Sequence, residues 1–182
     1  INSRLDYRNG KIYWTEIVPG LRWTHENYSV LKCYDLKEGR IKSITPRQRY
    51  LSPSVDKNGK VAAVSRTTVD GKNQLVLVEL EDGKELFAFQ VPGNAFIKEL
   101  TFTDQDEVVA VAVTDAGISL LQFTPSSGQW EELLSTASVN ITSPVWKDGR
   151  IYFESGANGT NNLYCLDLAD HQVYRLTCAR FG

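Results

Sequence analysis

The sequence from Ser143 to Thr177 reads SPVWKDGRIYFESGANGTNNLYCLDLADHQVYRLT, and it carries the clearest structural signal in the chain. It contains four short runs rich in β-forming residues, separated by three groups of turn-forming residues. The first turn contains Asp148-Gly149, a pair typical of tight β-hairpins because both residues tolerate positive φ angles. The stretch therefore predicts a four-stranded antiparallel meander. Such a sheet must stack on similar sheets to bury both of its faces.

The rest of the chain contains three further units of this kind. In the first unit, Asn9-Gly10 stands where the last unit has Asp148-Gly149. The run Cys33-Tyr34-Asp35-Leu36 likewise corresponds to Cys165-Leu166-Asp167-Leu168. The third unit keeps only the spacing and the apolar runs. The units recur roughly every 45 residues, the spacing of a four-stranded propeller blade; they cover about residues 5–45, 51–90, 98–134 and 143–177.

The predicted fold class is all-β. No window shows the apolar spacing of an amphipathic helix over three turns. Several runs, such as Val108 to Val113, are apolar on both faces, as expected for strands pressed between neighbouring sheets. A β-sandwich is the competing architecture, but it would not require four units of equal length in the same internal order. We expect a β-propeller of four consecutive four-stranded antiparallel blades.

Composition argues against several classes of function. The net charge of -2 and the scattered Lys and Arg residues do not favour nucleic-acid binding. No apolar run approaches the roughly 20 residues of a membrane-spanning helix. The three cysteines, Cys33, Cys165 and Cys178, form no C-x-x-C motif, and only two histidines accompany them, so we expect no metal site and no cofactor. Cys33 and Cys165 occupy equivalent strands of the first and last units, with two blades between them, so we expect no disulfide between them in an open arc.

The repeat pattern resembles that of TolB-like (WD-like) β-propellers. Its elements are Ser-Pro, then Asp-Gly or Asn-Gly before a short β run, then Leu-Tyr-x-Leu-Asp-Leu and a closing Leu-Thr. The last unit matches nearly throughout, from Ser143-Pro144 to Leu176-Thr177, and Ser52-Pro53 opens the second unit in the same way. The resemblance covers the whole chain and is strong in about half of it.

The resemblance implies a larger assembly than four blades, because TolB-like propellers usually have six or more. It favours an open arc of a larger propeller over a closed four-bladed ring, with residues 178–182 as the link to a further blade. Such propellers occur in bacterial periplasmic proteins, in large exported proteins and as gating domains of serine peptidases. The resemblance therefore implies a periplasmic, cell-surface or secreted location.

Two neighbouring segments are the candidate binding site. In such blades the loops between second and third strands lie on the same face as the links between blades. Loops on a rigid β scaffold often carry binding residues, and aromatic and Arg side chains are common anchors of interfaces. The loop from Val18 to Asn27 and the link from Thr45 to Ser52 together supply the candidates Arg22, Trp23, His25, Glu26, Arg47, Arg49 and Tyr50.

Each of these candidates has an alternative structural role. Trp23 packs either on its own blade or on a partner. Arg22, His25 and Glu26 form either part of a binding surface or a solvated rim. Arg47, Arg49 and Tyr50 either form, with Arg22, a cationic pocket for a carboxylate, which suits the planar guanidinium fork, or hold the link by pairing with local carboxylates.

The sequence predicts no catalytic residues. It contains no G-x-S-x-G motif, and His171 falls in a turn between outer strands, a poor place for a shielded site. The favoured function is a non-catalytic module that binds a protein, peptide or glycan in an exported bacterial protein. The alternative is an access-limiting propeller domain of a larger exported peptidase, with its catalytic domain outside these residues.

Overall fold

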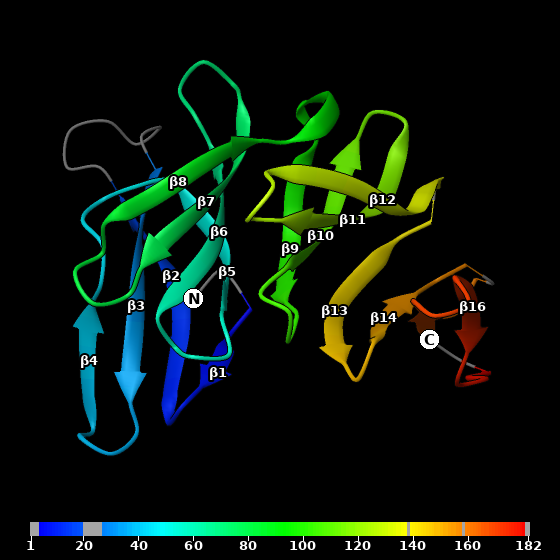
Figure 1. Ribbon diagram of the computed structural model, residues 1–182, viewed down its shortest axis with the longest axis horizontal. Coiled ribbons are helices and arrows are strands. Elements are labelled where there is room, and N and C mark those ends of the chain that lie inside the picture. Colours follow the sequence, from blue (N-terminus) through cyan, green and yellow to red (C-terminus); the bar gives the residue numbers. More distant parts are fainter. Residues whose placement is uncertain (1–3, 20–26, 138, 158, 181–182) are drawn as a thin grey trace.

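The computed structural model describes residues 4–19, 27–137, 139–157 and 159–180 (Figure 1). They form four antiparallel sheets of four strands, each in sequential order, so the predicted propeller architecture is confirmed. Blade 1 contains β1 (Asp6–Arg8), β2 (Lys11–Pro19), β3 (Asn27–Asp35) and β4 (Arg40–Ser43). Blade 2 contains β5 (Tyr50–Val55), β6 (Val61–Thr67), β7 (Asn73–Glu79) and β8 (Glu85–Gln90).

The other two blades repeat this order. Blade 3 contains β9 (Phe96–Phe102), β10 (Val108–Thr114), β11 (Gly117–Thr124) and β12 (Gln129–Ala137). Blade 4 contains β13 (Ile141–Lys147), β14 (Arg150–Ser155), β15 (Asn162–Asp167) and β16 (Gln172–Arg175). The helical structure in the described residues is a single short 3₁₀ turn, Pro92–Asn94, which precedes β9. No helix among the described residues is long and apolar enough to cross a membrane.

The predicted hairpin turns are present. Asn9 and Gly10 have φ angles of 50° and 77°, and Asp148 and Gly149 have φ angles of 51° and 75°. Positive φ at both central residues is the signature of the two-residue turn that matches the twist of paired strands. In blade 3, Asp106 adopts a φ of 61°. The third unit thus makes its turn without a glycine at the equivalent place.

The repeated Ser-Pro pair marks an irregularity in the first strand of two blades. Ser52 and Ser143 both have positive φ angles, 47° and 56°, and the strand register shifts next to each of them. Ser52 Oγ donates a hydrogen bond of 2.5 Å to the backbone oxygen of Lys98 in blade 3. The backbone N–H of Ser143 donates to Glu99 Oε2 at 2.8 Å, also in blade 3. The motif therefore connects the first strands of neighbouring blades.

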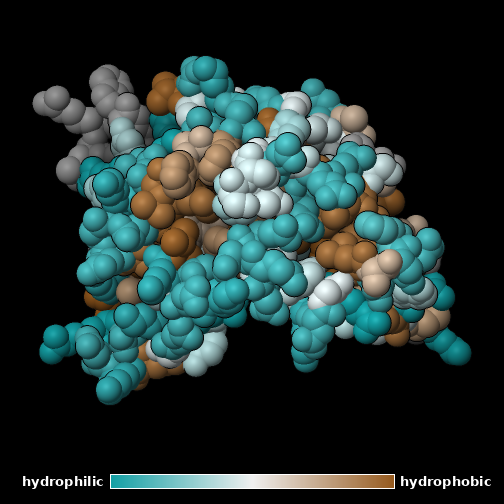
Figure 2. Space-filling model, in the orientation of Figure 1, coloured by the Kyte–Doolittle hydropathy of each residue, from teal (hydrophilic) through white to brown (hydrophobic). Residues whose placement is uncertain are grey.

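The hydrophobic cores lie between the blades. Ala62 and Val64 face blade 1, where they pack with Tyr13, Leu31 and other buried residues. Ala63, on the other face of β6, packs with residues of blade 3. A third cluster joins blades 3 and 4. Strands in the middle of the arc are apolar on both faces because each face meets another sheet. The visible face of the molecule is mostly hydrophilic, and hydrophobic side chains show between the blades (Figure 2).

Blades 1 and 4 lie at opposite ends of the row of sheets (Figure 1). Ile151 and Leu166 of blade 4 are fully buried against blade 3, with exposed fractions of 0% and 1%. Their equivalents in the repeat, Ile12 and Tyr34 of blade 1, are only half-buried. Tyr7, which pairs with Ile12, is 60% exposed. The face of blade 1 that would meet a preceding blade is thus uncovered.

The opposite end of the arc is uncovered in the same way. A cross-strand row of blade 4 runs through Val145, Tyr152, Cys165 and Tyr174 on the face away from blade 3. Val145 and Tyr174 are 41% and 48% exposed. Cys165 and its equivalent Cys33 are both free and buried. The four blades form an open arc, and large apolar side chains are exposed at both of its ends.

Candidate functional site

Part of the predicted site falls outside the structure. Arg22, Trp23, His25 and Glu26 lie outside the described residues. The site can be built from the link between blades 1 and 2, which carries Arg47, Arg49 and Tyr50, and from the strands around that link.

The link is fixed to β3 along its length. The backbone N–H of Ile44 donates to the oxygen of Leu31 at 2.8 Å. Further on, Ser29 and Gln48 exchange both of their backbone hydrogen bonds, at 2.6 and 2.8 Å. Ser29 Oγ then donates to the backbone oxygen of Tyr50 at 2.6 Å, just where β5 begins. Because these bonds bracket residues 47 and 49, the two arginines project from a backbone that is held in place.

Two adjoining hollows open between this link and blade 2. The first has a volume of about 270 Å³, and the second has a volume of about 280 Å³. They share Tyr28, Arg49 and Thr67, so they form one continuous surface, here called the arginine groove. The first hollow is also lined by Ile17, Ser29, Tyr50 and Leu51, and the second by Arg47, Gln48, Arg66, Thr68 and Val69.

The groove carries an uncompensated positive charge. Among the described residues, Arg47 and Arg49 form no ion pair and no side-chain hydrogen bond, and no Asp or Glu lines either hollow. Arg66 differs, because it contacts Glu85 at 2.6 Å and Gln74 Oε1 at 2.9 Å. The alternative that local carboxylates hold Arg47 and Arg49 is therefore wrong within the part of the chain that the structure describes.

Tyr50 has a different place from the one expected. It is 1% exposed and belongs to the core between blades 1 and 2, although it contributes to the wall of the first hollow. Its hydroxyl donates a hydrogen bond to Glu85 Oε1. Burial, and next the bond to Glu85, raise the pKa of Tyr50 well above its usual range. Tyr50 is thus a structural support of the groove rather than an exposed anchor.

Sequence reasoning missed the apolar side of the groove. Ile17 and Val69 are 37% and 88% exposed, and both line it together with Tyr28. Val69 had a usable signal, because it stands alone as an apolar residue in the polar turn between β6 and β7. Ile17 and Tyr28 carried no such signal, because either face of β2 and β3 could have been buried.

The described residues contain no cluster of three or more His, Cys, Asp or Glu side chains able to hold a metal ion. His171 is exposed in the turn between β15 and β16, the location that the sequence predicted.

No protein-family model and no curated protein matches the sequence. Among solved structures, the chain is similar to TolB from Acinetobacter baumannii, with a TM-score of 0.72 and 17% identity over 93% of this chain and 42% of that one. It is similar to a putative TolB from Agrobacterium tumefaciens, with a TM-score of 0.67 and 15% identity over 86% of this chain and 59% of that one. It also matches a puromycin-hydrolyzing peptidase from Mycobacterium tuberculosis, with a TM-score of 0.68 and 11% identity over 96% of this chain and 29% of that one.

The chain spans less than half of the length of the A. baumannii protein. At identities this low, structural similarity establishes the fold and leaves the activity open. The repeat pattern and the solved structures agree: this chain has the fold of the TolB-like β-propellers.

Proposed function

We propose that this chain is a non-catalytic TolB-like propeller module that binds a protein or peptide through the arginine groove, in an exported bacterial protein. The observation that carries the proposal concerns two arginines, Arg47 and Arg49, which have no ion-pair partner among the described residues. They lie beside the exposed apolar side chains of Ile17 and Val69. Arg and aromatic side chains are enriched at the centres of protein interfaces, where they supply most of the binding energy. The groove places arginine side chains beside aromatic and other apolar side chains on a fixed backbone.

The groove also lies where the fold favours recognition. It is bordered by the link between two blades and by the turn between β6 and β7. Loops and links at one end of a rigid β scaffold can present side chains without loss of stability. Arg22, Trp23, His25 and Glu26 fall between β2 and β3 in the sequence and lie outside the described residues, so their part in binding stays a prediction. The ligand classes of the proposal are protein, peptide and glycan.

The larger context of the module is part of the proposal. The uncovered apolar faces of blades 1 and 4 support the view that the arc belongs to a larger propeller with blades on both sides. The repeat resemblance and the structural similarity to TolB support a periplasmic or cell-surface location.

The second candidate function is an access-limiting propeller domain of an exported peptidase. The observation in its favour is the similarity to the M. tuberculosis peptidase, of which this chain covers 29%. In that case the catalytic groups would come from outside these residues. A hydrolase G-x-S-x-G or a zinc-peptidase H-E-x-x-H in the same open reading frame would favour this candidate, and further blades alone would favour the first.

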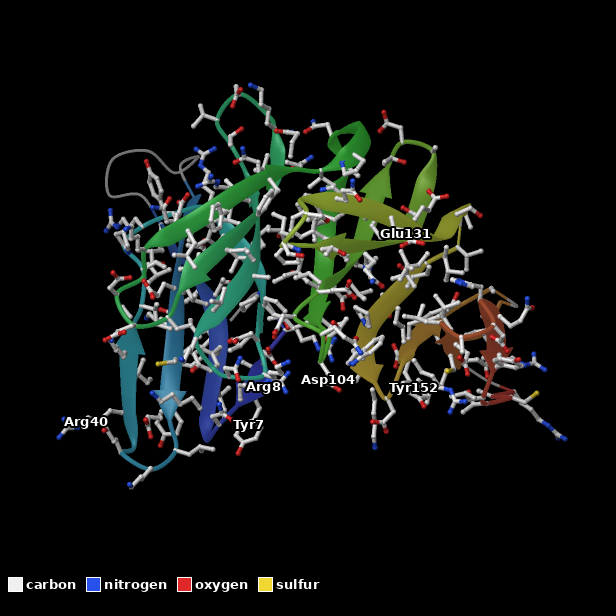
Figure 3. All side chains as sticks on the ribbon, in the orientation of Figure 1. Tyr7, Arg8, Arg40, Asp104, Glu131 and Tyr152 are labelled. Atoms are coloured by element: carbon white, nitrogen blue, oxygen red, sulfur yellow. The ribbon has the colours of Figure 1, made fainter. Side chains whose placement is uncertain are left out.

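The test of the proposed function is affinity capture with the immobilised chain. We expect specific partners to be retained by the wild type and lost by Arg47→Ala/Arg49→Ala. The control is Arg40→Ala/Arg175→Ala, which removes the same charge from exposed positions away from the groove; Arg40 lies at the far end of blade 1 (Figure 3). Both variants should keep the wild-type stability within about 0.5 kcal/mol, because the removed side chains are not in the core. Equal capture by all three proteins would show that the groove is not the binding surface.

A further inference from the structure

The two hollows of the arginine groove differ in chemical character. Ile17, Tyr50 and Leu51 line only the first hollow. Arg47 and Arg66 line only the second. Arg49 and Tyr28 line both and therefore mark the boundary between them. A ligand that fills the groove must present an apolar group to one side and a polar or charged group to the other.

The charge in the second hollow selects for an anion. Guanidinium groups stay protonated at every accessible pH, and their planar forks match a carboxylate in two-point contact. Arg66 is neutralised by Glu85, so the free charge belongs to Arg47 and Arg49. A cationic segment would be repelled, because no Asp or Glu among the described residues lines the groove to receive it.

The sizes of the hollows limit the ligand to small groups. Each hollow, at about 270 or 280 Å³, lies at the lower limit of small-molecule sites, which span roughly 300–1,000 Å³. Each is therefore suited to one or two side chains rather than to a large compact ligand. Since the hollows share three lining residues, the two groups that fill them must be close neighbours in the ligand.

We propose that the arginine groove recognises a peptide segment in which an acidic side chain stands next to a bulky apolar one. This inference rests on the proposed binding function and specifies its ligand. The apolar side chain occupies the hollow beside Ile17 and Tyr28, and the carboxylate meets Arg47 and Arg49. A neutral glycan would leave both guanidinium groups without a counter-charge, and burying them unpaired is unfavourable. The observations therefore favour a peptide over a glycan.

The test uses fluorescein-labelled nonapeptides and the wild-type chain, with binding followed by fluorescence anisotropy. The probe has the core Asp-Phe-Asp between Gly-Ser-Gly arms, and two control peptides have the cores Asn-Phe-Asn and Asp-Gly-Asp in the same arms. We expect the Asp-Phe-Asp peptide to bind and each control peptide to bind at least about tenfold more weakly. Binding should weaken as salt is raised, because the charged contact is partly exposed.

Protein variants locate the contact. Arg49→Ala should weaken binding of the Asp-Phe-Asp peptide about tenfold or more. Arg49→Lys should bind the peptide more tightly than Arg49→Ala but more weakly than the wild type, because an ammonium group lacks the planar fork of a guanidinium. Arg40→Ala should change nothing. Equal binding of the Asn-Phe-Asn peptide would overturn the inference, as would stronger binding of a tetragalacturonate, which is an anionic glycan. If no peptide binds but capture of protein partners still requires Arg47 and Arg49, the peptide inference fails and the proposed function stands. If no peptide binds and the capture of protein partners does not depend on Arg47 and Arg49, both the peptide inference and the proposed function fail.

Discussion

Tyr50 and Arg66 meet on one carboxylate. The Tyr50 hydroxyl donates to Glu85 Oε1, and Arg66 Nη1 contacts the same oxygen at 2.6 Å. Tyr50 begins β5 and Glu85 begins β8, so this network joins the first and last strands of blade 2 beside the arginine groove. It also has a consequence for the groove, because it neutralises Arg66 and leaves Arg47 and Arg49 as the charges available to a ligand.

The first prediction concerns the Tyr50 hydrogen bond. Tyr50→Phe keeps the buried ring and removes the hydroxyl group that donates a hydrogen bond to Glu85. We expect the free energy of unfolding to fall by about 1 kcal/mol. The loss is no larger because the Glu85 carboxylate is partly exposed and regains some hydration. Urea denaturation measures the change. Tyr174→Phe is the matched control, since that hydroxyl also donates to a carboxylate, Asp170, but on an exposed strand. A Tyr50→Phe variant as stable as the Tyr174→Phe variant would contradict this account.

The second prediction concerns alkaline pH. Burial raises the pKa of Tyr13 to about 12, and burial with the Glu85 bond raises that of Tyr50 further. A raised pKa means that the folded state holds its proton more tightly than the unfolded chain, whose tyrosines titrate near pH 10. The contribution of these tyrosines to the free energy of unfolding is therefore complete below about pH 10. It is lost as the pH rises toward their pKa values in the folded state. Burial also raises the pKa of the Cys33 thiol, which adds a loss from about pH 8.5.

The measurement is the urea midpoint between pH 8 and pH 11.5. We expect it to fall with increasing steepness above about pH 10, and less steeply in Tyr50→Phe, which lacks one of the titrating groups. Burial raises the pKa of the Cys165 thiol as well, so a Cys33→Ala/Cys165→Ala background separates the thiols from the tyrosines. A midpoint that stays constant above pH 10 would show that the tyrosines titrate alike in the folded and unfolded states.

The fold could be predicted from the sequence because each unit repeats the same local signals. Asn9-Gly10 and Asp148-Gly149 make the primed turns that their residue types indicate. The runs of β6 and β10, apolar on both faces, are strands with a sheet on either side. The start of the third unit differs from the prediction, because β9 begins at Phe96, two residues before the expected position 98. The residues between the 3₁₀ turn Pro92–Asn94 and position 98 contain no turn signal that would distinguish strand from link.

The site could be predicted only in part. The position of Arg47 and Arg49 on the link placed them on the loop-bearing face, as the repeat implies. Their lack of partners among the described residues could not be read from the sequence, because the sequence does not show which carboxylates lie near the link. Tyr50 was mistaken for a surface residue because it stands next to two arginines, whereas its register as the first residue of β5 turns it into the core.

The third prediction uses two glycines with nearly the same backbone. Gly83 and Gly71 have φ angles of 76° and 78°, so alanine at either position suffers similar conformational strain, about 1–2 kcal/mol. A Cβ on Gly83 would lie 2.0 Å from the backbone oxygen of Ile44, whereas a Cβ on Gly71 would have nothing within 4 Å. Gly83→Ala should therefore be clearly less stable than Gly71→Ala in urea denaturation, because the turn must move away from blade 1. Equal losses would mean that the β7–β8 turn does not pack on blade 1 as described.

The last prediction concerns the open ends of the arc. Ile151 is fully buried between blades 4 and 3, whereas Ile41 of blade 1 is 64% exposed on the face that no blade covers. Ile151→Ala should cost about 2–5 kcal/mol of unfolding free energy, and Ile41→Ala should change it by no more than about 0.5 kcal/mol. Removing Ile41 should also reduce self-association of the isolated chain at high concentration, since exposed apolar patches favour association. Urea denaturation and sedimentation velocity on the two variants measure these effects. A large loss of stability in Ile41→Ala would show that blade 1 is covered in solution, either by a second copy or by a closed ring.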